Sequence, residues 1–521
     1  MNMKLEQTTS VWMEMSGHLT CETLTKDIQT DACVVGAGIA GLTTAYLLLK
    51  EGRSVVVLDD GPIGGGQTER TTAHLSNAID DRYQQIEDLH GGEGARLAAE
   101  SHSAAIDRVE SIIANEKIEC DFERLDGYLV ASPGERPDLL ECELQAAHRA
   151  GLTEVEMVPS CPWGDYDTGA CLRFPRQAQF HPLKYLAGLA EAIRRLGGRI
   201  FTQSHAQDIE SGPPALVRTR EGFQVTAASI VIATNSPFND LVTIHTKQAP
   251  YMTYVLGISV PRGAVTKALY WDTQSPYHYV RLVSPSASES TTPQQEDPPS
   301  EDLLIVGGED HKTGQADDSE ERYRRLEMWA RERFPAVEDV RYRWSGQVLE
   351  TNDGLAFIGR NPLGGQNVYI ATGDSGQGMT HGTIAGMLLT DLIVGRQNPW
   401  TKLYDPARVT LRAVKKFLQE NLNVALQYSA WVTGGSVSTT HEIPFGKGAV
   451  VRRGLMKVAA YRDAMGVLHE CSAICPHLGG IVEWNHNESS WDCPCHGSRF
   501  DKNGHLLCGP ANSDLAPMCE T

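Results

Sequence analysis

A glycine-rich segment near the N-terminus constrains the fold of this 521-residue chain most strongly. The segment Gly36-Ala-Gly38-Ile-Ala-Gly41 stands between an apolar run at 31–35 and a helical pattern at 42–50, and a second apolar run at 55–58 ends at Asp59. This order predicts a strand–helix–strand unit whose glycines allow a tight turn, a close pyrophosphate and helix–strand packing. Asp59 is placed to accept hydrogen bonds from a ribose diol. The segment therefore predicts a dinucleotide-binding α/β domain.

Composition excludes several classes of protein. Hydrophobic residues make up 41% of the chain and charged residues 21%, which is typical of a soluble globular protein, and no apolar run reaches the roughly 20 residues of a membrane span. The net charge of −20 argues against nucleic-acid binding. The N-terminus lacks the apolar stretch of a secretory signal, and half of the twelve cysteines are scattered without a disulfide framework, so we expect a cytoplasmic protein.

Two cysteine–histidine pairs lie near the C-terminus. Cys475-Pro-His477 is followed, after fifteen residues, by Cys493-Pro-Cys-His496. Two thiolates on one iron and two imidazoles on the other are the ligands of a Rieske [2Fe–2S] cluster. We therefore predict Cys475, His477, Cys493 and His496 as metal ligands. A structural zinc site shares these ligand types and is the alternative, although it does not account for the flanking Pro, Gly-Ser and Gly-Pro residues.

Periodic patterns place the remaining elements. Between 284 and 302 the chain is rich in Ser, Pro, Gln and acids and predicts a mobile surface insertion. A strand–loop–helix unit is expected at 367–394 and a helical linker at about 400–428. Further helices are expected at about 93–116 and 183–196, and further strands at 230–234, 251–259, 277–283 and 303–307.

Three segments resemble the D-amino-acid oxidase superfamily of FAD-dependent oxidoreductases, which contains the glycine and sarcosine oxidases. They are the Gly- and Thr-rich loop from Gly64 to His74, the strand end Val231-Ile-Ala-Thr-Asn235, and the segment from Ile370 to Gly382. The resemblance implies FAD rather than NAD. It also implies that the free N–H groups at the start of the 378–394 helix stabilise negative charge on reduced flavin. The implied cofactor-binding residues are Gly36, Gly38, Ile39, Ala40, Gly41, Asp59, Gly66, Thr68, Thr71, Thr72, Ala73, Thr234, Gly373, Gly376, Gly378 and Met379.

The resemblance also sets the expected domains. We expect a Rossmann-like FAD-binding domain of α/β class with an interleaved α+β substrate domain over residues 1–400, a helical linker at 401–430, and a small all-β Rieske domain at 431–521. The FAD-binding parts are expected at about 28–110, 200–240 and 340–400, and the substrate parts at about 111–199 and 241–339.

The substrate domain of this superfamily orients an amine or amino acid above the flavin. Within 277–281 the odd positions share one strand face, so Arg281 could hold a carboxylate if that face turns to the flavin. The alternative is an exposed strand whose arginine pairs with a surface acid. We name Arg281, Tyr279 and Tyr254 as candidate catalytic residues. His74 could be a covalent flavin attachment or, as the simpler alternative, a hydrogen-bonded loop residue.

Three positions of the cluster motif bear on its reduction potential. The respiratory Rieske proteins join their two cluster loops by a disulfide, and here Cys495 matches one half whereas the other position is Gly480. A tyrosine of those proteins that donates to a ligand sulfur is replaced here by Phe500, while the serine that bonds a bridging sulfide is present as Ser498. Because donors to the sulfurs stabilise the reduced cluster, we expect a potential below the respiratory class.

Together these motifs predict an enzyme that oxidises a C–N bond of a small amine or amino acid at FAD. The electrons are then expected to leave singly through the Rieske cluster to an external one-electron carrier. Two alternatives stay open at this point. One is an oxidase that uses oxygen and carries an incidental cluster, and the other is a redox-responsive protein without turnover.

Overall fold

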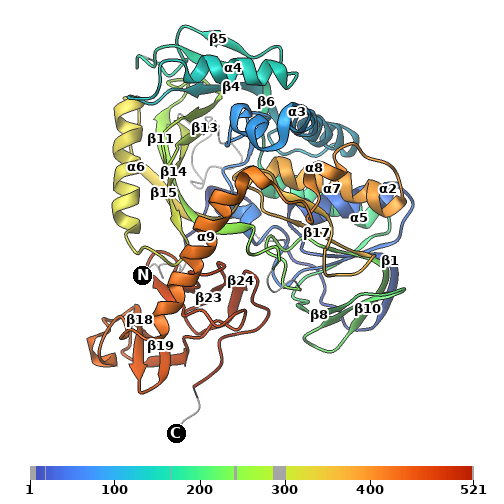
Figure 1. The fold of residues 1–521 in the computed structure, drawn as a ribbon, viewed down its shortest axis with the longest axis vertical. Coiled ribbons are helices and arrows are strands. Elements are labelled where there is room, and N and C mark those ends of the chain that lie inside the picture. The colour runs from blue at the N-terminus through green and yellow to red at the C-terminus, as the bar shows by residue number, and fades with distance from the viewer. Residues whose placement is uncertain (1–7, 18, 165, 240–242, 285–300, 519–521) are drawn as a thin grey trace, which may run out of the picture.

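The computed structural model describes residues 8–17, 19–164, 166–239, 243–284 and 301–518. The segment that the sequence predicts to be a mobile insertion falls largely at 285–300, outside the described residues. The described chain forms two large sheets, with helices packed around them, and two small sheets at the C-terminal end (Figure 1). In the part of the chain that is described, no helix combines the length and apolar character needed to cross a membrane.

The first large sheet is the dinucleotide-binding one. Its strand order is β16-β17-β10-β1-β2-β7, and all neighbours are parallel except β16, which runs antiparallel to β17. A hairpin of β8 and β9 extends it from β10. The strands are β1 (Ile28–Val35), β2 (Val55–Leu58), β7 (Arg199–Phe201), β8 (Ala206–Glu210), β9 (Ala215–Thr219), β10 (Gln224–Ile232), β16 (Phe357–Arg360) and β17 (Val368–Thr372).

Helices cover one face of this sheet. The side chains of Val34, Val55 and Val57 belong to the core that these helices form, whereas Cys33, Val35 and Val56 point to the opposite face. Gly386 of α7 packs directly on Thr43 of α2, because a Cβ atom at Gly386 would lie 2.4 Å from the Thr43 Cγ2 atom. The helices are α2 (Ile39–Lys50), α3 (Tyr83–Glu116), α5 (Pro182–Arg195) and α7 (Gly378–Val394).

The second large sheet is predominantly antiparallel and contains most of the part that is expected to bind substrate. Its order is β15-β11-β14-β13-β12-β4-β6-β3, with β5 paired to β6 and with β12 and β4 parallel. Helix α6 (Ser319–Arg333) packs on β11 and β14, and α4 (Leu139–Arg149) lies near β5 (Figure 1). The strands are β3 (His74–Leu75), β4 (Glu123–Val130), β5 (Glu156–Val158), β6 (Cys171–Gln179), β11 (Gln248–Pro261), β12 (Leu269–Asp272), β13 (Tyr279–Val283), β14 (Glu301–Lys312) and β15 (Val340–Thr351).

The two large sheets do not follow the boundaries expected for the FAD-binding and substrate parts of the chain. Strand β15 pairs with β11, so residues 340–351 lie in the second large sheet, whereas they were expected in the FAD-binding part at 340–400. Helix α5 packs on α2 beside the first sheet, although it falls in a part expected to be substrate-binding. Both segments contribute surfaces where the two sheets meet.

The C-terminal part is all-β and follows a helical connection. Helices α8 (Thr401–Tyr404) and α9 (Val414–Gln427) lead to it, and α9 runs diagonally from the flavin-side helices down to the small sheets (Figure 1). One sheet has the order β18-β19-β20 and the other β21-β22-β23-β24. Their strands are β18 (Lys447–Arg453), β19 (Met456–Arg462), β20 (Leu468–Ser472), β21 (Glu483–Asn485), β22 (Ser490–Asp492), β23 (Arg499–Asp501) and β24 (Leu506–Cys508).

Candidate active site and iron–sulfur centre

A cavity of about 660 Å³ lies where the two large sheets meet. Its lining includes the turn between β1 and α2, the loop before β3, the end of β10 and the start of α7. These are the positions at which a doubly wound sheet binds its ligand, outside the carboxyl ends of the strands.

Three glycines shape the phosphate end of the cavity. Gly36 has a φ of +108°, and a Cβ atom there would lie 2.4 Å from the Ala233 carbonyl oxygen, so only glycine fits this turn. A Cβ atom at Gly41 would lie 1.9 Å from the Gly36 carbonyl oxygen. Gly38 lines the cavity at the N-terminus of α2, where a Cβ atom would approach the Thr68 Oγ1 atom to 3.1 Å. The backbone is thus bare where a pyrophosphate would lie, and the site fits FAD.

Asp59 closes the end of β2 on the cavity wall. Its Oδ2 atom accepts a hydrogen bond from the Ala37 N–H at 2.5 Å and its Oδ1 atom accepts one from the Gly61 N–H at 2.8 Å. Burial, followed by the charge of Asp60, raises the pKa of Asp59 to about 7. The carboxyl group is therefore held rigidly, and each oxygen retains acceptor capacity toward the cavity.

Thirteen of the sixteen predicted cofactor residues line this cavity. They are Gly36, Gly38, Ile39, Ala40, Asp59, Gly66, Thr68, Thr71, Thr72, Thr234, Gly376, Gly378 and Met379. The lining does not include Gly41, Ala73 and Gly373. Gly41 and Gly373 are packing positions, since a Cβ atom at Gly373 would lie 2.5 Å from the Thr351 Cγ2 atom. Ala73 is buried, with a φ of +58°.

The three candidate catalytic residues lie in different surroundings. Tyr279 lines the cavity, and its hydroxyl group is 2.7 Å from the Thr253 Oγ1 atom. Tyr254 is buried in the core beside α6, with its hydroxyl group 2.9 Å from His311 Nε2. Of the three, Tyr279 alone is in the cavity lining.

Arg281 lies behind the wall of the cavity. Its Nη1 atom donates to the carbonyl oxygens of Thr72, Ala73 and Phe180 at 3.0, 2.9 and 3.2 Å, and its guanidinium group stacks 5.2 Å from the Trp12 ring centre. Burial lowers the pKa of Arg281 to about 9. In this position Arg281 supports the Thr-rich loop from the rear instead of reaching a substrate carboxylate.

His74 lines the cavity with both ring nitrogens engaged. Its Nδ1 atom is 3.0 Å from the Thr72 Oγ1 atom and its Nε2 atom is 3.2 Å from the Val280 carbonyl oxygen. Burial, and then the charge of Arg281, lowers the pKa of His74 to about 3, so the imidazole is neutral. These contacts match the expectation of a hydrogen-bonded loop histidine.

The two cluster loops bring the predicted metal ligands together in pairs. The thiol groups of Cys475 and Cys493 hydrogen-bond each other, and the ring centres of His477 and His496 are 5.0 Å apart. The Nδ1 atom of His496 is buried without a hydrogen-bond partner among the described residues. Two cysteines beside two histidines, with an imidazole nitrogen left for a metal, fit a [2Fe–2S] cluster of Rieske type. No three His, Cys, Asp or Glu side chains within the described ranges converge on a single ion.

The residues around the ligands include the three positions that bear on the reduction potential of the cluster. A Cβ atom at Gly480 would lie 2.7 Å from the Cys495 Sγ atom, so this glycine directly faces the cysteine whose disulfide partner it replaces. The Ser498 hydroxyl group hydrogen-bonds Cys475. Phe500 is fully buried and carries no donor. The site therefore keeps the serine hydrogen bond to a ligand sulfur, beside backbone hydrogen bonds at His477 and Cys495, and lacks the tyrosine donor.

The cluster domain forms part of the wall of the flavin cavity. Six residues of the segment 506–512 line the cavity: Leu506, Leu507, Cys508, Gly509, Ala511 and Asn512. Gln347 of β15 also lines it, and its Nε2 atom donates to the Gly497 carbonyl oxygen at 2.9 Å, directly after the ligand His496. One buried side chain thus touches both the flavin cavity and a cluster loop.

A third histidine covers the two histidine ligands. His245 belongs to the segment between β10 and β11, which starts with the cavity residues Ala233, Thr234 and Asn235. Its ring centre is 4.9 Å from that of His477 and 6.0 Å from that of His496. All three rings are buried or nearly so, and the histidine edge of the cluster site faces the flavin domain.

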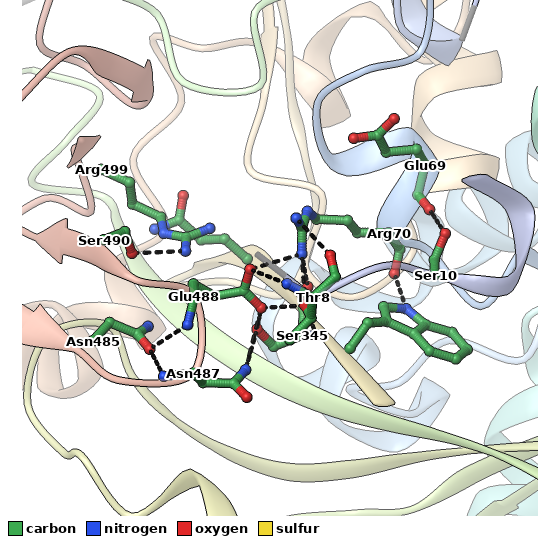
Figure 2. Close-up of polar contacts among 12 residues, drawn as sticks. Thr8, Ser10, Glu69, Arg70, Ser345, Asn485, Asn487, Glu488, Ser490 and Arg499 are labelled. Atoms are coloured by element: carbon green, nitrogen blue, oxygen red, sulfur yellow. Dashed lines mark hydrogen bonds and ion pairs between the residues drawn. The ribbon is translucent and has the colours of Figure 1, made fainter. Parts of the chain in front are cut away.

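A buried ion pair joins the two domains beside the Thr-rich loop (Figure 2). Arg70, which precedes Thr71, donates from Nη1 to the Ser345 carbonyl oxygen at 2.9 Å and to Glu488 of the β21–β22 turn at 3.2 Å. Glu488 also accepts hydrogen bonds from the hydroxyl groups of Thr8 and Ser345. Burial alone would raise the pKa of Glu488, but the charges of Arg70 and Arg499 and these hydrogen bonds outweigh it and lower the pKa.

Several cavity residues were missed by the sequence interpretation. Asp374 lies within the segment from Ile370 to Gly382, and Asp310 closely follows the strand expected at 303–307, so a closer search of those strand ends could have found them. Asp80 follows the Thr-rich loop, whereas Glu350 and Gln347 lie in β15 and carry no local signal. Their place in the cavity depends on how the two sheets meet.

Fold and cavity together define a flavin-dependent oxidoreductase with an appended iron–sulfur domain. A family model described as FAD dependent oxidoreductase matches residues 31–392, and one described as Rieske [2Fe-2S] domain matches residues 435–518. The chain therefore belongs to the FAD-dependent oxidoreductase family and carries a C-terminal Rieske domain. It binds FAD and a [2Fe–2S] cluster.

Known proteins share this organisation in whole or in part. The chain is 31% identical over 494 residues to YhfW of Bacillus subtilis (strain 168), which is named as a Rieske 2Fe-2S iron-sulfur protein, with 94% of each chain covered. It is 30% identical over 389 residues to gamma-glutamylputrescine oxidoreductase of Escherichia coli (strain K12), covering 72% of this chain and 86% of the relative. The glycine oxidase structure from Geobacillus kaustophilus has the same fold, with a TM-score of 0.59 at 16% identity over 73% of this chain and 99% of that one.

Proposed function

We propose that the chain is a dehydrogenase that oxidises an amine or amino acid in the flavin cavity and passes the electrons singly through the Rieske cluster to an external one-electron carrier. The strongest support is that the cluster domain forms part of the cavity wall. The Gln347 side chain lines the cavity and hydrogen-bonds the loop that carries His496. A cluster without a redox role would not need its two histidine ligands to face the flavin domain.

Bound FAD supplies a two-electron acceptor for hydride, and the cluster supplies one-electron transfer. One C–H bond and one N–H bond of the amine break and a C=N bond forms. Two electrons reduce two oxidised carriers, two protons go to solvent, and water hydrolyses the imine product. The protein binds and orients the amine and excludes water, and we propose Tyr279 as a residue that contacts the substrate. We propose Tyr254 and Arg281 as positioning residues, which act through His311 and the Thr-rich loop respectively.

The contact between the domains is the proposed electron-transfer junction. Electron transfer slows steeply when packed atoms between two centres are replaced by a gap, so a fixed contact favours it. Gln347 fixes the loop that carries His496, and His245 packs on both histidine ligands. The name of the Escherichia coli relative, which refers to an amine, supports an amine substrate. We keep the cytoplasm as the proposed compartment, because no cysteine in the described part of the chain forms a disulfide.

The test is anaerobic mixing of the holoenzyme with a panel of amines and amino acids. The proposal expects bleaching of the flavin absorbance, followed by the EPR signal of the reduced cluster. His245→Leu should slow cluster reduction about tenfold or more, as loss of a residue beside metal ligands commonly does. His486→Asn, which breaks an ion pair between the domains away from the flavin cavity, is the matched control. Flavin bleaching without cluster reduction, together with stoichiometric peroxide in air, would indicate an oxidase instead.

A further inference from the structure

The substrate side of the flavin cavity has a wall of carboxyl groups. These acids come from four distant segments, namely the loop after β3, the strands β14 and β15, and the turn between β17 and α7. All four are in the lining of the cavity, and they are Asp80, Asp310, Glu350 and Asp374. Burial raises the pKa of Asp80 and of Glu350, and the nearby charge of Asp310 adds to the rise in both. The fold thus gathers acids that mutual repulsion would keep apart in the unfolded chain.

Two of these acids, Asp80 and Asp310, are placed so that they could bind a cation. The Asp80 carboxylate accepts from the Tyr277 hydroxyl group at 2.8 Å and from Gln377 Nε2 at 2.7 Å, so it is held against Gly376 at the flavin side. The Oδ1 atom of Asp310 is buried without a hydrogen-bond partner among the described residues. A buried acceptor that lacks a donor is costly, and an N–H group of a ligand would satisfy it.

Aromatic rings complete the same part of the cavity. Trp271, Tyr277 and Tyr279 line it, and the two tyrosine rings are 5.5 Å apart. The faces of such rings attract ammonium groups, most strongly when the cation is removed from water. The carboxyl groups and the aromatic rings together form a binding surface for an alkylammonium group. They are two separate observations, because they come from different side chains.

Cations act on these carboxyl groups only from outside the cavity lining, where the charges of Arg322 and Lys416 oppose, without reversing, the raised pKa of Asp310 and of Glu350. Of the described residues, the cavity lining includes two arginines and no lysine. Arg70 is bound to Glu488 and to a backbone carbonyl, and Arg220 lies beside His205, which pairs with Asp60 past the end of β2. Arg281 is behind the wall. A substrate carboxylate would therefore meet carboxylates instead of a guanidinium clamp.

We propose that the substrate is a dication, namely an alkyl diamine or polyamine whose second ammonium group is bound by Asp310, Asp80 and Glu350 while the first amine is oxidised. This inference rests on the proposed amine oxidation and specifies its substrate class. It also predicts discrimination by charge. A neutral alkyl tail forgoes the ion pairs, and a carboxylate tail is repelled.

Three compounds of matched length test the charge of the tail: 1,4-diaminobutane, butylamine and 4-aminobutanoate. With the holoenzyme and an excess of ferricenium as the one-electron acceptor, 1,4-diaminobutane should be oxidised with a KM about tenfold or more below that of butylamine, and 4-aminobutanoate should be the poorest of the three. Asp310→Asn should remove most of the preference for the diamine over butylamine. Asp107→Asn, an exposed acid on α3, is the control and should keep the preference. Equal KM values for the three compounds would overturn the inference.

A second measurement separates this inference from the proposed function. The bis-quaternary compound 1,4-bis(trimethylammonio)butane carries both charges but no N–H bond to lose, so binding is read from the perturbed absorbance of oxidised flavin without turnover. The inference expects saturable binding that Asp310→Asn weakens and that butyltrimethylammonium does not match. Binding of the dication, combined with no flavin reduction by any amine, would refute the proposed function and leave the cavity assignment standing. No binding of the dication, combined with reduction by amino acids, would refute the cavity assignment and leave the proposed function standing.

Discussion

The Nη1 atom of Arg70 lies 3.2 Å from the Oε2 atom of Glu488, and both side chains are buried between the flavin domain and the cluster domain. Arg70 lies within the Gly- and Thr-rich loop, and Glu488 lies in the turn before β22, the strand that precedes the ligand Cys493 (Figure 2). The two redox sites are therefore tied together by a charge pair that has left water. Breaking such a pair costs more than the pair contributes, because one charge stays buried alone.

Glu488→Ala should destabilise the docked protein by about 3 to 5 kcal/mol, because the guanidinium group of Arg70 loses its carboxylate in a buried position. Thermal unfolding of the holoenzyme measures the loss. Glu470→Ala breaks an exposed pair with Arg453 and is the matched control, for which the expected change is below about 1 kcal/mol. A loss no larger than that of the control would show that the junction does not depend on this pair.

Acid should weaken the docking of the two domains. The folded structure lowers the pKa of Glu488, so the unfolded chain binds its proton more readily. The stabilisation is present at neutral pH, above the ordinary carboxyl pKa, and is lost as the pH falls through the lowered value. Unfolding free energies measured from pH 7 downward should therefore drop more steeply for the wild type than for Glu488→Gln. Parallel curves for both would contradict this.

Binding of a dication should strengthen as the pH rises through the range from about 6 to 7. Burial raises the pKa of Asp80 to about 7 and that of Asp310 to about 6, so at lower pH both carboxyl groups are protonated and offer no charge. Titration of oxidised flavin absorbance with 1,4-bis(trimethylammonio)butane at several pH values measures this. Asp80→Asn should shift the midpoint to a lower pH. An affinity that stays constant from pH 5.5 to 8, about the span that brackets both groups, would count against it.

Phe500→Tyr should raise the reduction potential of the cluster. The added hydroxyl group can donate to a ligand sulfur, which stabilises the reduced and more negative cluster. An EPR-monitored redox titration should place the wild type in the lower part of the range of roughly −150 to +300 mV and the variant above it. Phe417→Tyr, in the helical connection, is the control and should leave the potential unchanged. A wild-type value at the top of the range would contradict the expectation.

Gly36→Ala should abolish FAD retention. The added methyl group would meet the Ala233 carbonyl at 2.4 Å while the backbone is held at a φ of +108°, so the turn that faces the pyrophosphate must deform. The ratio of flavin absorbance to protein absorbance after purification measures retention. Gly92→Ala in helix α3 meets no atom closer than 3.7 Å and should retain FAD fully. Equal flavin content in both variants would refute the role of this turn.

Local spacing was sufficient for some parts of the fold and not for others. The unit from β1 to β2 and the two ligand loops follow from residues within a few positions of one another, and the fold class and cofactors were confirmed. Helix α3 begins at Tyr83, earlier than the pattern expected at 93–116, because a kink at Gly91 with a φ of +76° interrupts the periodicity. The turns before this kink form a separate short helical stretch, so the pattern expected at 93–116 corresponds to the helix that follows the kink.

The substrate side was much harder to predict. Tyr279 and Arg281 share a strand face as expected, but the Thr-rich loop covers Arg281, and strand periodicity contains no information on which loop lies above it. Gln347 and Glu350 acquire their roles only when β15 pairs with β11. His245 meets the cluster ligands because two domains dock, which depends on contacts between residues more than two hundred positions apart.

The cover that His245 and its segment place over the histidine ligands restricts access to the cluster site. With both imidazole edges turned into the docked interface, iron and sulfide have no direct approach to His477 and His496 from that side. Insertion of a cluster from the histidine side would therefore require the C-terminal domain to be undocked, with the Arg70–Glu488 pair open.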